Sequence, residues 1–169
     1  MQLFKKPYTI GELMNIDLGR QERAGGCVVE LEKTYHQLKP ESILDKFRNI
    51  FRFNKPLVKA YYVIFKFKVL SNTGNSHSVF VKINPDFNLT NWENNPIEIY
   101  CDCADFKYRS AYILNQRGSL FLTDRIRNNL GAALTETPKK GAKTSFLCKH
   151  SYAVLTWLIS NYTGIMRTI

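Results

Sequence analysis

Four residues in two short pairs have the types and spacing of a metal site. One residue separates Cys101 from Cys103, and one residue separates Cys148 from His150. Three thiolates and one imidazole form a Cys3His set, which zinc binds tetrahedrally in structural sites. Because protein atoms would fill all four positions on the metal, no position remains for a reacting water. The sequence therefore predicts one structural zinc ion with these four residues as its ligands.

Two other interpretations of the cysteines have to be weighed. Unpaired cysteine is among the most buried residue types, so the three could be small core side chains, with His150 capping a helix. That interpretation leaves unexplained why three of the four cysteines and one of the three histidines share one pattern. Disulfides are the weaker alternative, because the charged N-terminus, interrupted by Pro7, is unlike a secretory signal and a reducing compartment favours metal. Cys27 follows two glycines and is expected to be a core thiol.

Hydrophobic periodicity predicts the elements that position the two pairs. Period-two alternation predicts strands over 27–35, 58–70, 77–83 and 97–101, and the last three form an antiparallel meander that ends at the first pair. Helical spacing predicts helices over 42–52, 104–116 and 150–160, and a shorter one within 122–130. The expected fold class is α+β, an antiparallel sheet with helices packed on one side, stapled by the Cys3His zinc site.

Two local features refine this expectation. Thr9 and Glu12 have the spacing of a capping box, which predicts a short helix at the start of the chain. Trp157 and Leu158 recur at helical spacing from His150, so both are expected to be buried.

The order C-x-C, spacer, C-x-H resembles the SWIM-type zinc finger, and the expected strand before the first pair and helix after the second fit that family. The resemblance covers about 95–160, with a long insertion at 118–147. A spacer of 44 residues separates Cys103 from Cys148. Loop-closure entropy grows only with the logarithm of length, so such an insertion is compatible with the site. The whole chain, 1–169, is expected to form a single domain.

A wider segment around the two pairs has further characteristic residues, which are Asp105, Phe106, Lys107, Tyr108, Arg109, Leu147 and Lys149. With these residues the segment is similar to a subgroup of SWIM-like proteins encoded by tailed bacteriophages. Many members of that subgroup are virion components, so the resemblance implies a structural protein of a phage particle, made in the host cytoplasm and located in the virion. Its implied partners are other virion proteins in a multi-subunit assembly, and the resemblance does not distinguish head, neck or tail.

The charge of the chain supports an alternative function. A net charge of +10 and a pI near 9.5 favour an anionic partner, so the alternative is a nucleic-acid-binding SWIM-type module with DNA as its partner. Arg109 and Arg117 lie near two tyrosines in sequence and could place cations beside stacking rings, although the tyrosines could equally cover a neighbouring element. The remaining candidate contacts are Lys139, Lys140 and Lys143, in a polar, basic loop over 135–145.

The sequence lacks the motifs of common enzyme classes. It contains no phosphate-binding glycine-rich loop, no G-x-S-x-G and no H-E-x-x-H. His36 and His77 lie outside any sequence cluster and are expected to be structural or exposed. No apolar run approaches the roughly 18 residues of a membrane span. We therefore expect no enzymatic activity, no small-molecule substrate and no membrane partner.

Overall fold

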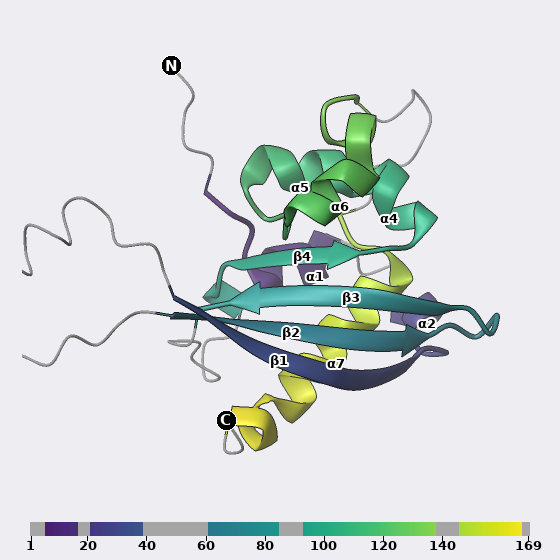
Figure 1. Ribbon diagram of the computed structural model, residues 1–169. Coiled ribbons are helices and arrows are strands. Elements are labelled where there is room, and N and C mark those ends of the chain that lie inside the picture. The colour runs from purple at the N-terminus through teal and green to yellow at the C-terminus, as the bar shows by residue number, and fades with distance from the viewer. Residues whose placement is uncertain (1–5, 17–20, 39–60, 85–92, 138–145, 167–169) are drawn as a thin grey trace, which may run out of the picture.

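The computed structural model describes residues 6–16, 21–38, 61–84, 93–137 and 146–166 of the 169-residue chain. A four-stranded sheet and several helices build these parts (Figure 1). The strands are β1 Val28–Leu38, β2 Tyr61–Leu70, β3 Ser76–Ile83 and β4 Ile97–Cys101. The helices are α1 Ile10–Ile16, α2 Gln21–Ala24, α4 Ala104–Arg109, α5 Ala111–Arg117, α6 Asp124–Leu130 and α7 Lys149–Met166, with a 3-10 turn η3 Gly131–Leu134. The predicted helix over 42–52 lies outside the described residues.

The sheet is antiparallel, and its strands lie in the order β1-β2-β3-β4. Side chains alternate between its faces as predicted. On β2, Phe65 and Phe67 are fully buried, and Lys68, the next residue along the strand, is exposed. The second face carries the ion pairs Lys66–Glu32 at 2.6 Å and Lys82–Glu98 at 2.8 Å. It is covered near β4, where Tyr100 is buried and Phe80 stacks on Phe121. The predicted α+β class and antiparallel sheet are confirmed.

Helix α7 covers the apolar face of the sheet and lies behind the strands in Figure 1. Val154, Leu155 and Leu158 are fully buried in this layer. Helices α4, α5 and α6 gather beyond the β4 edge instead of over the sheet (Figure 1). None of the helices in the described parts of the chain is long and apolar enough to span a bilayer.

Two predictions about helices were inaccurate. The helix predicted over 104–116 is two helices, α4 and α5, which meet at Ser110, where φ is −104° instead of the usual value near −63°. Trp157 is half-buried where full burial was expected, and its ring packs edge-on against Phe67 with centroids 5.4 Å apart. Leu158, its neighbour, is fully buried as predicted.

The insertion between the ligand pairs is folded over its first part. Ser119 and Phe121 exchange backbone hydrogen bonds with Ile99, so this segment runs along the outer edge of β4. Gly118 ends α5 in the left-handed conformation, with φ of 69°, which glycine adopts without steric cost. Near the N-terminus, Thr9 and Glu12 form the predicted capping box.

Candidate metal centre

Each predicted ligand lies at the end of a regular element. Cys101 is the last residue of β4, and Cys103 caps α4, where its Sγ accepts the backbone N–H of Phe106 at 3.4 Å. Cys148 precedes α7 and accepts the N–H of Ser151 through its Sγ, also at 3.4 Å. His150 lies in the first turn of α7. A strand end and two helix starts thus point four side chains to one place.

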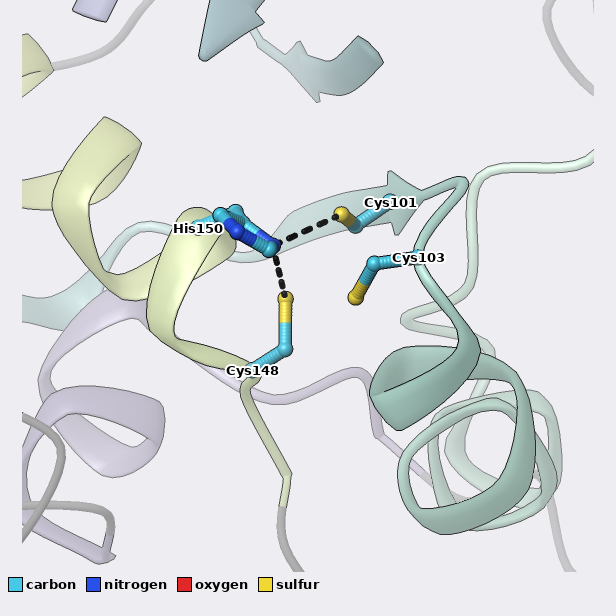
Figure 2. A group of neighbouring side chains, drawn as sticks. All are labelled: Cys101, Cys103, Cys148 and His150. Atoms are coloured by element: carbon cyan, nitrogen blue, oxygen red, sulfur yellow. Dashed lines mark hydrogen bonds between the residues drawn. The ribbon is translucent and has the colours of Figure 1, made fainter. Parts of the chain in front are cut away.

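The four ligand atoms converge in the interior of the protein (Figure 2). They lie within 4.8 Å of one another, and all four residues are buried. His150 Nδ1 is 3.9 Å from the Sγ atoms of both Cys101 and Cys148. Its other ring nitrogen, Nε2, is buried and has no hydrogen-bond partner among the described residues.

The donor set fits zinc. Tetrahedral geometry with zinc–sulfur bonds of about 2.3 Å and zinc–nitrogen bonds of about 2.0–2.1 Å separates sulfur from nitrogen by about 3.6 Å. The observed separations of 3.9 Å exceed this by a few tenths of an ångström. Four buried soft donors would close the coordination shell of the metal, as in structural sites. The Cys3His group is consistent with one structural zinc ion, as the sequence predicted.

The three thiols do not share charge equally when no metal is bound. Burial raises the pKa of Cys101 well above its usual value. The hydrogen bond with Cys101 lowers the pKa of Cys103, but the bond with Cys148 and burial together raise it to about 12. Burial also opposes ionisation of Cys148, yet hydrogen bonds with the two other cysteines, His150 and Ser151 bring its pKa well below its usual value. Of the three thiols, Cys148 is therefore the one whose ionisation its surroundings favour, and ionisation of Cys101 and Cys103 is disfavoured.

Two further residues contact the site, and sequence reasoning missed both. His77, expected to lie outside any cluster, stacks on His150 with ring centroids 4.2 Å apart. Its Nδ1 lies 3.0 Å from Oδ1 of Asp102, the residue between the first two cysteines. Only the strand pairing reveals that His77 contacts the site, because the register that joins Val79 to Cys101 brings the start of β3 to the end of the C-x-C pair.

The candidate partner contacts do not form one cluster in the described residues. Arg109 pairs with Asp105 in the same helix at 3.0 Å, and Arg117 lies over the ring of Tyr8 at 4.9 Å. Lys139, Lys140 and Lys143 lie outside the described residues.

The fourth cysteine is separate from the metal cluster. Cys27 is half-buried just before β1 and does not belong to the group of four converging ligands. Burial raises the pKa of its thiol, and the charge of Lys149 opposes that shift.

Comparison with known proteins agrees with this geometry. The family model described as SWIM zinc finger matches residues 79–112 and 139–156, which is 52 of the 169 residues and includes all four ligands. The unmatched residues between the two ranges hold most of α5, all of α6 and η3. No curated protein matches the chain, and no solved structure does. The region around the buried Cys3His group is thus similar to the SWIM zinc finger, a metal-binding module.

Proposed function

We propose that this chain is a non-enzymatic, zinc-stapled structural protein of a tailed-bacteriophage particle that acts through protein–protein contacts with other virion proteins. The observation that carries the non-enzymatic part is the closed ligand set. Four buried protein donors leave no position for a substrate or a water on the metal. Such a site stabilises a small core without disulfides, because metal-binding free energy becomes folding free energy.

The phage-like motif after Cys103 lies on α4, and most of its side chains have partners within the chain. Phe106 is fully buried and packs edge-on against Tyr100, and Asp105 pairs with Arg109 on the helix surface. Lys107 donates to the backbone oxygen of Asn129 at 2.8 Å, which joins α4 to α6. These side chains are therefore occupied in the fold.

Tyr108 is the remaining member of that motif and is 66% exposed. Tyrosine is enriched in protein interfaces because its ring offers apolar area and its hydroxyl offers a hydrogen bond. Since its motif neighbours already have partners within the chain, we propose Tyr108 as the side chain that contacts a neighbouring virion protein.

Several cations of the described residues give limited support to nucleic-acid binding, because they are engaged with acidic side chains. Lys66 is paired with Glu32, Lys82 with Glu98 and Arg109 with Asp105. A basic groove that follows a phosphate backbone needs uncompensated cations.

The proposal is tested on the particle itself. Particles of the phage that encodes the chain are purified on a density gradient and probed with an antibody against the chain. We expect the chain to sediment with intact particles and Tyr108→Ala to reduce its incorporation at least tenfold. Tyr35→Ala, which alters an exposed tyrosine on β1, is the matched control and should incorporate normally.

The opposite outcome is equally specific. A chain that stays in the soluble lysate and binds DNA with a steep salt dependence would refute the structural role. That outcome would support the nucleic-acid-binding alternative.

A further inference from the structure

The two ligand pairs are held by one segment that contributes no ligand. This segment, which we call the hairpin end, comprises residues 71–78, the β2–β3 turn and the first residues of β3. We propose that the hairpin end positions the two ligand pairs relative to each other and so determines the geometry of the metal site. Asp102 and Lys149, the residues inside the two ligand pairs, attach both pairs to it, and His77 fixes the ring of His150. This inference is independent of the partner that the protein binds.

Asp102 attaches the C-x-C pair to the hairpin end through three contacts. Its backbone N–H donates to the carbonyl of Ser78 at 3.2 Å, and its Oδ2 accepts the N–H of Ser78 at 3.0 Å. Its Oδ1 lies 3.0 Å from His77 Nδ1. Because the flanking residues are Cys101 and Cys103, these contacts set the direction in which both sulfurs leave the chain.

Lys149 attaches the C-x-H pair to the same segment. Its Nζ donates to Ser71 Oγ at 2.8 Å and to Asn72 Oδ1 at 3.0 Å. The turn that presents these oxygens is closed by a 2.8 Å hydrogen bond from Ser71 N to Asn75 O, and Gly74 supplies its positive φ of 83°. Cys148 and His150, on either side of the lysine, are thus positioned relative to β3 by contacts that do not involve the metal.

His77 performs the task that a hydrogen bond usually performs for a ligand histidine. The nitrogen that does not bind metal commonly donates to a carboxylate or carbonyl, which fixes the ring. Here Nε2 of His150 is buried without such a partner in the described residues. The stacked ring of His77, 4.2 Å away and itself held by Asp102, restrains the imidazole so that Nδ1 faces the sulfurs.

The test measures metal binding by Asp102→Asn, Lys149→Met and His77→Ala in the full chain. Cobalt-loaded protein is titrated with a chelator of known affinity, and its visible absorption is recorded. Each variant is expected to bind metal about 10–100-fold more weakly, the usual cost of losing a group that orients a ligand. Lys82 provides the matched control, because Lys82→Met removes the ion pair with Glu98 farther along β3 and should bind metal as wild type does.

Two further measurements separate positioning from general stability. Nitrogen-15 shifts of the imidazole should show Nδ1 bound to metal in wild type and a mixture of bound nitrogens in His77→Ala. Lys149→Arg keeps donors to the turn and should recover most of the affinity, and His77→Phe keeps a stacking ring if the alanine variant does not fold. Affinities within twofold of wild type in Asp102→Asn and Lys149→Met, or unchanged imidazole shifts in His77→Ala, would overturn the proposal.

Discussion

Removal of the metal is the perturbation that best tests the site. The four ligands connect the end of β4 and the start of α4 with the start of α7, which follows the 44-residue spacer. Without metal, packing and hydrogen bonds keep these ends together, and the raised pKa values of Cys101 and Cys103 oppose the ionisation of these two thiols there. We therefore expect chelation to lower stability strongly without abolishing the sheet, because the hydrophobic core also holds many apolar side chains of the sheet and α7, such as Phe65, Phe67 and Leu155.

The size of the effect follows from linked binding. Free zinc at 1,000 times its dissociation constant stabilises the folded state by about 4.1 kcal/mol. For chains of 150–250 residues, each kcal/mol shifts the melting temperature by roughly 2–4 °C. A chelator that removes free zinc should therefore lower the melting temperature by roughly 8–16 °C.

Calorimetry gives the melting temperature, and hydrogen exchange shows where protection is lost. We expect faster exchange in α4 and the first turn of α7, and little change in the β2–β3 hairpin away from the site. Cys27→Ser is the matched control, because this cysteine lies outside the cluster and the variant should remain as sensitive to chelator as wild type. A melting temperature unchanged by chelator, with unchanged exchange in α4, would refute the structural zinc.

Three further predictions address the thiols, the α7 packing and the basic loop. Zinc binding should release ~2 protons from Cys101 and Cys103, so the apparent zinc affinity should rise with pH below the raised pKa values of these thiols. Calorimetry in buffers of different ionisation enthalpy counts the released protons. Binding that releases no protons would contradict the view that Cys148 ionises more readily than the other two thiols. Leu158→Ala should lower the free energy of unfolding by about 2–5 kcal/mol, and Trp157→Ala by only about 2 kcal/mol, because the indole is only half-buried. Denaturant unfolding measures both losses. A larger loss for Trp157→Ala than for Leu158→Ala would mean that α7 is rotated. Joint replacement of Lys139, Lys140 and Lys143 by Ala should impair particle assembly and leave DNA affinity unchanged. The opposite result would favour nucleic-acid binding: intact assembly, with the slope of log K for DNA against log salt concentration shallower by about three units.

Local patterns predicted the parts of the fold that depend on one stretch of chain. Alternation predicted the strand at β2, where Phe65 and Phe67 now share the buried face, and the two short pairs identified the four ligands, because each signal lies within a few residues. The break at Ser110 was missed because its neighbours keep helical spacing, and the departure is a change in one backbone angle. Half-burial of Trp157 was missed because helical spacing gives a face but not how far the covering sheet extends.

The missed role of His77 has a different physical origin. His77 lies 24 residues before Cys101, and no motif in its local sequence indicates a contact with the metal site. Its position is set by the β3–β4 register, and a shift of one residue would turn its side chain to the opposite face of the sheet.

Contacts at both ends of the long insertion explain how the site tolerates its length. The insertion leaves the site along the β4 edge, held there by the hydrogen bonds between Ser119, Phe121 and Ile99, and returns at Leu147, which is fully buried. Both of its ends therefore have contacts in the fold besides the metal ligands. Closing the intervening chain costs entropy that grows only with the logarithm of its length, and that cost is met when the ends pack. The metal then joins ends that are already close, so the length of the spacer has little influence on the ligand geometry.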